Sequence, residues 1–234
     1  MASNGMMPII YNTSHQRDFV EKSVEAIETF LLKRFKERRI LRVALSGGQS
    51  PIPVYQALAH SKKIEWSRIQ LFLVDERYVP LNSEDSNYRM IQESLIEPAG
   101  NVRKFYSYNT RETLKKLAAQ YQAMLELLKP PLFDLVILGL GADGHTASLF
   151  PHDPALHESR RLVVHTVRPG AEPQDRLTLT FPAILSSEKI VFLVQGKNKA
   201  VVLDRWLHGS ASLDDLPAKG VLAHPDIEVF YCGN

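Results

Sequence analysis

The sequence predicts an α/β fold with a mainly parallel sheet flanked by helices. Short runs rich in apolar and β-branched residues recur along the chain, and several are apolar almost throughout, as in strands buried on both faces of a parallel sheet. Segments with helical apolar spacing alternate with these runs. Small, polar or charged residues follow several runs directly, which is typical of ligand-binding loops beyond the carboxyl ends of parallel strands.

The first predicted element is an amphipathic helix at about 18–38, where apolar side chains from Phe19 to Phe35 recur three and four residues apart. The predicted strands, each a short apolar run, cover 40–45, 69–74, 133–138, 162–167, 177–181, 190–194 and 227–231. Further helices are predicted at 53–59, 88–96, 112–128 and 199–207. No linker or repeat divides these elements, so we expect 1–234 to form a single domain.

Composition excludes several classes of protein. A hydrophobic fraction of 44% and a charged fraction of 23% are ordinary for a globular protein, and no apolar run approaches the ~20 residues of a membrane span. A formal net charge of +2 gives no reason to expect nucleic acid. The one dense basic cluster, 33–39, is interpreted as the solvated end of a helix. We therefore expect no nucleic-acid partner and no membrane partner.

The single cysteine, Cys232, excludes an intramolecular disulfide and any multi-cysteine metal site, and we expect it to be a small apolar residue in a terminal strand. The first residues lack a basic region followed by an apolar core, so they do not resemble a secretory signal. A cytoplasmic location is expected.

The segment GLGADG, 139–144, follows the apolar run 133–138 as a dinucleotide-binding fingerprint would. That fingerprint needs a helix beginning at its third glycine and an acidic residue roughly 20 positions further on. Pro151 limits any helix here to about one and a half turns, and the next predicted strand ends toward Arg168. A nicotinamide cofactor is therefore not expected.

The same loop still has the composition of an active-site loop. Asp143, His145, Thr146 and Ser148 come directly after a buried strand, and the glycines allow the backbone to approach a ligand closely. The structural alternative is that His145 merely caps a short helix. The loop alone does not decide between the two.

The segment SGGQSP, 46–51, connects a strand to a predicted helix through small residues. Free N–H groups, the dipole of the following helix and the hydroxyls of Ser46 and Ser50 would form a phosphate cradle. No Gly-Lys-Ser/Thr sequence follows, so this is not a Walker A loop. An ordinary turn is the alternative.

A third segment, DERYVP, places Asp75, Glu76 and Arg77 directly after the run 69–74. Charged residues at the end of a buried strand are commonly functional, because a buried strand gains nothing by carrying them inward. In the structural alternative Asp75 caps a turn while Glu76 and Arg77 are solvated. Downstream, DSNY (85–88) indicates a helix start with Asp85 or Ser86 as the N-cap.

The three segments, in this order, closely resemble the bacterial-type 6-phosphogluconolactonase family, which is related to glucosamine-6-phosphate deaminase. The likeness covers nearly the whole chain and continues through 176–180, 191–200 and 216–219. It implies a Rossmann-like α/β fold and hydrolysis of 6-phospho-glucono-1,5-lactone to 6-phosphogluconate in the pentose phosphate pathway. It also implies that a phosphorylated sugar lactone is the small-molecule partner and that the protein needs no metal and no cofactor.

The resemblance makes His145 the general base that takes a proton from the attacking water. Imidazoles titrate near neutral pH, and general-base catalysis typically supplies ~10²–10⁴-fold. Asp143 would orient the ring or stabilise the imidazolium, a role that we infer from the chemistry. Arg77 would stabilise the developing oxyanion or hold the substrate phosphate, and both roles stay open.

For the phosphate, the related deaminases point to Ser46, Gly47, Gly48 and Lys199. Arg168 and Arg176 are further candidates for the same anion. The alternatives are that Lys199 is an exposed first-turn residue and that Arg176 faces solvent from a strand. Remote binding of the phosphate would position the lactone carbonyl against water and the base.

Two other functions compete. An amino-sugar-phosphate deaminase or isomerase would share the fold, but the loop of such enzymes carries a glutamate that supports the histidine, and 143–151 lacks it. A non-catalytic sugar-phosphate sensor would need a helix-turn-helix segment, and we find none before the first predicted strand. We expect a monomer or weak homo-oligomer.

Overall fold

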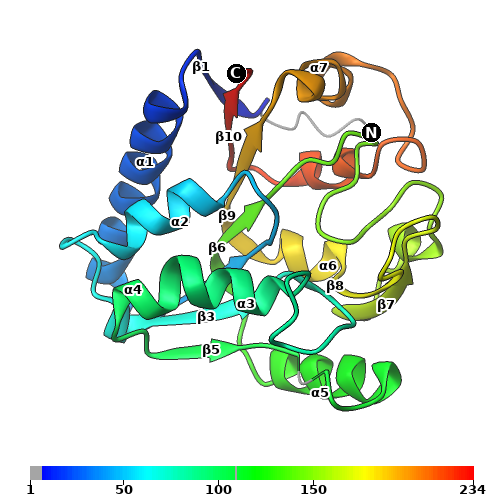
Figure 1. Cartoon of the computed structure of the whole chain (residues 1–234), viewed down its shortest axis with the longest axis horizontal. Helices are drawn as coiled ribbons and strands as arrows, with labels where there is room; N and C mark the ends of the chain where they lie inside the picture. The colour runs from blue at the N-terminus through cyan, green and yellow to red at the C-terminus, as the bar shows by residue number, and fades with distance from the viewer. Residues whose placement is uncertain (1–6, 109) are drawn as a thin grey trace.

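A seven-stranded sheet forms the centre of the protein in the computed structural model, which describes residues 7–108 and 110–234 (Figure 1). Its strands are β1 (Ile9–Thr13), β2 (Leu41–Leu45), β3 (Ile69–Leu73), β5 (Lys104–Tyr106), β6 (Phe133–Leu138), β9 (Ser187–Gln195) and β10 (Ile227–Cys232). They lie in the order β1-β10-β9-β6-β2-β3-β5, and every neighbouring pair is parallel. The predicted α/β class with a mainly parallel sheet is confirmed.

Helices cover both faces of this sheet. They are α1 (Gln16–Glu37), α2 (Ile52–Ala59), α3 (Asn87–Ile91), a π-helix (Gln92–Ile96), α4 (Glu97–Ala99), α5 (Leu114–Glu126), α6 (Phe181–Leu185) and α7 (Ala200–His208). The 3₁₀ segments are Trp66–Arg68, Pro154–His157, Lys197–Lys199 and Pro217–Ala223. Helices α1 to α4 pack together on one side, and α6 and α7 contact the 3₁₀ segment Pro217–Ala223 on the other (Figure 1).

A second sheet corrects part of the prediction. Strands β4 (Asp75–Arg77), β8 (Asp175–Leu179) and β7 (Val163–Val167) form an antiparallel sheet of their own. The strands predicted at 162–167 and 177–181 pair in this sheet and not in the parallel one, because the loop between them is far shorter than a parallel crossover requires. The second of these strands ends two residues earlier than predicted, because α6 begins at Phe181 with Pro182 in its first turn.

Other differences concern short or irregular elements. The helix predicted at 88–96 is divided into α3, the π-helix and α4, and Ser86 is its N-cap, with its Oγ accepting the N–H of Arg89. Strands β1, β4 and β5 were not predicted, since they are short and β1 and β5 are only partly buried. No helix begins at Gly144 or His145; turns and an isolated bridge between Thr146 and Leu149 form this part of the loop. The alternative that His145 caps a short helix is therefore wrong.

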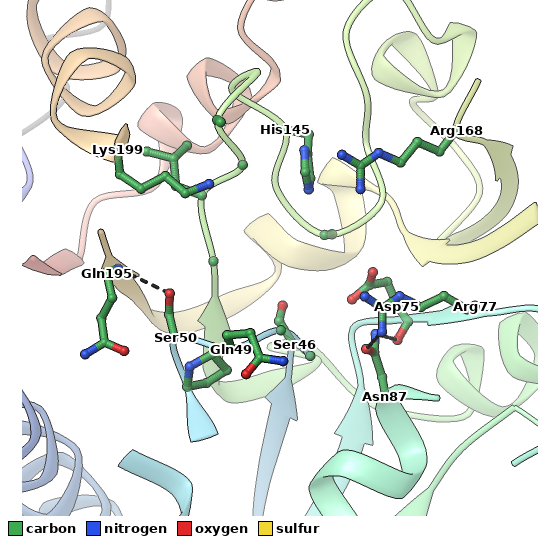
Figure 2. Close-up of a pocket in the computed structure, with 18 of the residues that line it drawn as sticks. Ser46, Gln49, Ser50, Asp75, Arg77, Asn87, His145, Arg168, Gln195 and Lys199 are labelled. Carbon is green, nitrogen blue, oxygen red and sulfur yellow. Dashed lines mark hydrogen bonds between the residues drawn. The ribbon is translucent and has the colours of Figure 1, made fainter. Parts of the chain in front are cut away.

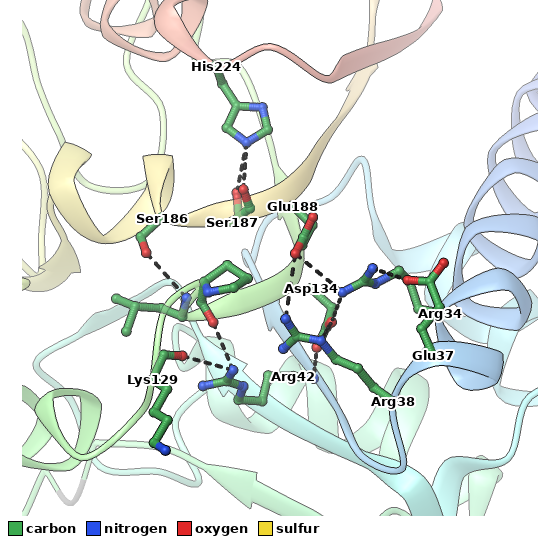
Figure 3. A network of polar contacts seen from close by, with 12 residues as sticks. Arg34, Glu37, Arg38, Arg42, Lys129, Asp134, Ser186, Ser187, Glu188 and His224 are labelled. Atoms are coloured by element: carbon green, nitrogen blue, oxygen red, sulfur yellow. Dashed lines mark hydrogen bonds and ion pairs between the residues drawn. The ribbon is translucent and has the colours of Figure 1, made fainter.

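A buried ionic network joins α1 to the amino ends of β2 and β6 (Figure 3). Asp134 is fully buried on β6 and accepts the N–H of Arg42 at 2.9 Å, while Arg34 and Arg38 of the basic cluster pair with the same carboxylate. Only 13% of the Arg34 side chain is exposed. The interpretation of the cluster as solvated is thus wrong for Arg34. The run 133–138 was treated as apolar although it contains Asp134, and this buried carboxylate draws Arg34 out of the solvent.

Two predictions from composition can be compared with the described residues. Cys232 is fully buried in β10, as expected for a small apolar residue in a terminal strand. Within 7–108 and 110–234, no helix combines the length and apolar character that a bilayer crossing needs.

Candidate active site

A cavity of about 500 Å³ lies at the carboxyl ends of the parallel strands (Figure 2). Its walls come from the loops that follow β2, β3, β6, β7 and β9. Between β2 and β6 the strand order reverses, since the chain continues to β3 on one side and to β9 on the other. Loops diverge at such a switch point and leave a crevice in which ligands of open α/β sheets bind.

The fold brings together most of the candidate residues from the sequence. Those that line the cavity are Ser46, Gly47, Gly48, Arg77, His145, Arg168 and Lys199. Asp143 contacts the His145 ring without lining the cavity. Arg176 is buried in β8, and its guanidinium donates to the carbonyl oxygens of Pro173 and Asp175. The structure therefore brings Arg176 neither to the cavity nor to solvent.

Ser50 of the predicted phosphate cradle and Asp75 of the DERYVP segment also line the cavity. Four further lining side chains were not predicted as parts of this site, namely Gln49, Asn87, Gln195 and Asn198. Asn87 lies in the DSNY segment, and Gln195 ends a buried strand. Their position after strand ends was the available signal. Nothing in the described residues groups three or more His, Cys, Asp or Glu side chains closely enough for a metal ion.

His145 and Asp143 form a hydrogen-bonded pair at the rim of the cavity. His145 Nδ1 lies 2.5 Å from Asp143 Oδ1, and the same oxygen accepts the backbone N–H of His145 at 3.2 Å. Burial favours the protonated carboxyl of Asp143, but the hydrogen bonds and charge of His145 outweigh it and hold the pKa of Asp143 well below its usual range. A carboxylate on Nδ1 favours the tautomer with a proton there, which leaves Nε2 as the free base on the cavity side.

Glycine is required where the loop folds back beneath this pair. A Cβ on Gly141 would lie 2.0 Å from His145 Nδ1 and 2.5 Å from Asp143 Oδ1, so any side chain there would displace both groups. Gly144 has a φ of +88°, a conformation that side chains disfavour. The Thr146 hydroxyl donates to the Gly139 carbonyl at 2.9 Å and pins the end of the loop. Thr146 is therefore an anchor of the loop rather than a reacting group.

The loop after β2 is held from below and open toward the cavity. The Ser46 N–H donates to Ile137 of β6 at 3.0 Å, and the Tyr55 hydroxyl donates to the Ser46 carbonyl at 2.9 Å. The buried Ser46 Oγ has no partner, and within the described residues neither the Gly47 nor the Gly48 N–H forms a hydrogen bond. Three free donors at one edge of a cavity suit an anionic oxygen.

Arg77 is positioned by a network on the opposite wall. Its Nη1 donates to Asn87 Oδ1 and to the Asp85 carbonyl, both at 2.7 Å. Asn87 in turn donates to the Asp75 carbonyl at 2.9 Å. Beneath them the Glu76 carboxylate, fully buried, accepts four hydrogen bonds, and the donors are the N–H groups of Arg77, Asn87 and Tyr88 and the Ser86 hydroxyl. Glu76 is therefore a structural carboxylate, not a solvated one.

Glu76 should make the stability of the protein depend on pH. Burial raises its pKa from 4.5 to about 7, and the four hydrogen bonds only partly oppose this. Because the folded state then binds the proton more tightly than the unfolded chain, the contribution of Glu76 to the free energy of unfolding falls as pH rises from about 4.5 to about 7. Between about pH 5 and pH 8, the free energy of unfolding of the wild type should fall by roughly 2 kcal/mol relative to that of Glu76→Gln, as measured by urea denaturation. Parallel pH profiles would contradict this assignment.

Lys199 and Arg168 add two cations to the cavity. Lys199 ends the 3₁₀ segment Lys197–Lys199, is half-buried rather than exposed, and its amine points toward the cavity (Figure 2). Burial lowers the pKa of Lys199, with Asp143 acting in the opposite direction. The Arg168 guanidinium lies 5.6 Å from the centre of the Phe150 ring, beside His145 in Figure 2. With Arg77, three cations thus surround a cavity that also presents free backbone donors.

Comparisons with known proteins agree with this geometry. The family model described as glucosamine-6-phosphate isomerases/6-phosphogluconolactonase matches residues 14–230. The 6-phosphogluconolactonase of Synechocystis is 36% identical over 224 residues, which are 92% of this chain and 91% of the relative. A crystal structure of a 6-phosphogluconolactonase from Shewanella baltica has a TM-score of 0.88 at 29% identity, covering 97% of this chain and 100% of that chain. The crystal structure of a 6-phosphogluconolactonase from Thermotoga maritima has a TM-score of 0.80 at 35% identity, and the match covers 97% of this chain and 100% of that chain.

Proposed function

Because this chain belongs to the glucosamine-6-phosphate isomerase/6-phosphogluconolactonase family, we propose that it hydrolyses 6-phospho-D-glucono-1,5-lactone to 6-phosphogluconate, a step of the pentose phosphate pathway. One observation carries the proposal beyond the family. An imidazole held by a carboxylate faces a cavity that is lined by three cations and by free backbone donors. A base beside an anion-binding cavity is what hydrolysis of a phosphorylated lactone requires.

The reaction follows from the His145–Asp143 pair. Nε2 of His145 takes a proton from water as the water oxygen attacks the lactone carbonyl carbon. The negative charge that develops on the carbonyl oxygen is stabilised by a cation or by loop N–H groups, with Arg77 a candidate for this role as well as for the phosphate. When the intermediate collapses, the bond to the ring oxygen breaks and the imidazolium returns its proton to that oxygen. Asp143 keeps the ring in the reactive tautomer throughout.

The phosphate is assigned to the side of Lys199. The Lys199 amine, the free N–H groups of Gly47 and Gly48 and the unpartnered Ser46 hydroxyl all border the same cavity. Arg168, on the loop after β7, lines the same cavity and is a further candidate for this anion. Binding energy from this remote group would hold the lactone carbonyl near His145.

Replacing Lys199 with alanine should weaken binding more than turnover. A charge-assisted hydrogen bond to phosphate is worth about 1.5–3 kcal/mol, so KM and the Kd for 6-phosphogluconate should rise roughly 10- to 100-fold. The matched control is Lys197→Ala, since Lys197 is an exposed lysine of the same 3₁₀ segment that does not line the cavity. If the two variants changed KM and Kd equally, the assignment of Lys199 to the phosphate site would be wrong.

The first experiment follows acid release from freshly generated 6-phosphogluconolactone, corrected for spontaneous hydrolysis, with glucosamine 6-phosphate as a parallel substrate. Rapid lactone opening without ammonia supports the proposal. Ammonia release would favour the deaminase reaction instead; against it, no glutamate contacts the His145 ring within the described residues. Inertness toward both substrates would favour a sugar-phosphate sensor.

We further propose that residues 1–234 act as one catalytic domain in the cytoplasm, as a monomer or weak homo-oligomer. Loops of one chain form the cavity, which supports a catalytic unit of a single subunit. A sugar phosphate does not cross membranes unaided, so the enzyme must share a compartment with the reactions that make it. Light scattering after size-exclusion chromatography tests the oligomeric state, and cell fractionation tests the location.

A further inference from the structure

Asp75 is the one carboxylate among the described residues that line the cavity, where three cations gather to attract an anionic substrate. It comes from β4, which β3 delivers to the cavity, and only 7% of the residue is exposed. A negative charge inside an anion-binding cavity opposes the phosphate. Its presence therefore needs a reason other than attraction of the substrate as a whole.

The hydrogen bonds of Asp75 do not account for its charge. Its Oδ2 accepts the buried Ser148 hydroxyl at 2.7 Å, and no hydrogen bond within the described residues reaches Oδ1. The neighbouring guanidiniums of Arg77 and Arg176 form their hydrogen bonds elsewhere, with Asp85 and Asn87 and with Pro173 and Asp175. A buried carboxylate whose one direct partner is a neutral hydroxyl is costly, and an asparagine of the same shape would be cheaper.

The open oxygen of Asp75 is available to the cavity. Asp75 lines the cavity and keeps a small exposed area, and no described group hydrogen-bonds its Oδ1, so a ligand in the cavity can reach this oxygen. A carboxylate oxygen only accepts hydrogen bonds, and it therefore selects groups that donate. In a phosphorylated sugar lactone the donors are the ring hydroxyls, whereas the phosphate and the carbonyl only accept.

Asp75 and Lys199 lie on different sides of the cavity. Figure 2 shows Asp75 beside Arg77 and Asn87 on one side of the cavity and Lys199 on the opposite side. Among the lining residues, Asp75 offsets the positive charge of Arg77 beside it, while no lining carboxylate lies beside Lys199. Asp75 therefore repels a phosphate dianion, whereas Lys199 attracts one.

We propose that Asp75 accepts a hydrogen bond from a ring hydroxyl of the substrate and so orients the lactone, with its hydroxyl edge toward β4 and its phosphate toward Lys199. This inference rests on the proposed function and adds a specificity-determining residue to it. Asp75 would hold the sugar that the phosphate has brought in, and it would disfavour phosphate esters that lack hydroxyls. The step involves binding alone and leaves the chemistry to His145.

The test is Asp75→Asn, which keeps the shape of the side chain and removes its charge. The Kd for 6-phosphogluconate, which keeps the sugar hydroxyls of the lactone in its open chain, should rise about tenfold or more, because a hydroxyl loses a charged acceptor. The Kd for inorganic phosphate should stay unchanged or fall, because repulsion disappears. Isothermal titration calorimetry measures both ligands on each protein. If Asp75→Asn bound both ligands more weakly, the substitution would have damaged the cavity. If it bound both as the wild type does, Asp75 would not contact the substrate. Either result would overturn the proposal.

Ser148→Ala is the control. It deletes the buried hydrogen bond that Asp75 Oδ2 accepts but keeps the Asp75 carboxylate, and Ser148 does not line the cavity. The Kd for 6-phosphogluconate should change much less than in Asp75→Asn; an equal rise would assign the effect to loop structure and overturn the proposal. The wild type reports separately on the proposed function. A wild type inert toward the lactone would refute that function, whereas an active wild type with an unaffected Asp75→Asn variant would refute this inference alone.

Discussion

Replacing His145 with alanine should lower kcat by about 10²–10⁴-fold while changing the Kd for 6-phosphogluconate only a few-fold. The imidazole is the base that accepts the proton of water, and no other group in the described cavity pairs with a carboxylate in the same way. The phosphate contacts proposed for Lys199 and the 46–48 loop do not involve this ring. Acid-release kinetics and calorimetry measure the two quantities.

The chain offers a matched control for this variant. His157 also pairs with an aspartate, since its Nε2 lies 2.8 Å from Asp214 Oδ1, but neither residue lines the cavity. His157→Ala should retain wild-type kcat and KM. If His145→Ala kept wild-type activity, or if the two variants lost activity equally, His145 would not be the base.

Asp143→Asn should produce the second large loss, about 10²–10⁴-fold in kcat with little change in KM. The variant keeps the volume of the side chain but replaces the carboxylate oxygen 2.5 Å from His145 Nδ1 with a neutral amide. An amide nitrogen turned toward Nδ1 would favour the tautomer with its proton on Nε2, which cannot accept one from water. The imidazolium formed during the reaction would also lose its counter-charge.

The pKa of Asp143 sets the pH range of this effect. Because that pKa lies well below its usual range, the carboxylate stays ionised across the working pH range, so Asp143→Asn should lower kcat/KM at every working pH. Asp214→Asn is the control and should match the wild type throughout. Wild-type kcat/KM in Asp143→Asn would contradict the orienting role.

The long buried strands of the fold were predictable from sequence, while short elements were not. The run 133–138 forms β6 at the predicted residues, and 190–194 lies within the longer β9, because continuous apolar runs have no stable place except a sheet covered on both faces. Strand β4 has only three residues, all charged, and no periodicity to detect. The antiparallel sheet was missed because local patterns do not say which strands pair.

The candidate site was predicted only in part, because local patterns show which residues follow a strand but not which strands pair. Residues after strand ends, such as Ser46, Arg77 and His145, could be chosen from the motifs alone, and the structure places them around one cavity. Arg176 could not be excluded, because its position in the second sheet depends on pairing with β4. The contact between the Asn87 side chain and Arg77 depends on the helix start at Ser86.

By itself, the sequence determined the α/β class, the switch from buried strand to polar loop at 46, 75 and 139, and the presence of a base next to a carboxylate in the 143–145 segment. These features are local, since they depend on apolar runs, glycines and neighbours two residues apart. Tertiary structure alone decided which cations meet the base, that Glu76 is buried among four donors, and that Asp75 faces Lys199 across the cavity. Those distances join loops far apart in the chain, and only strand order and register set them.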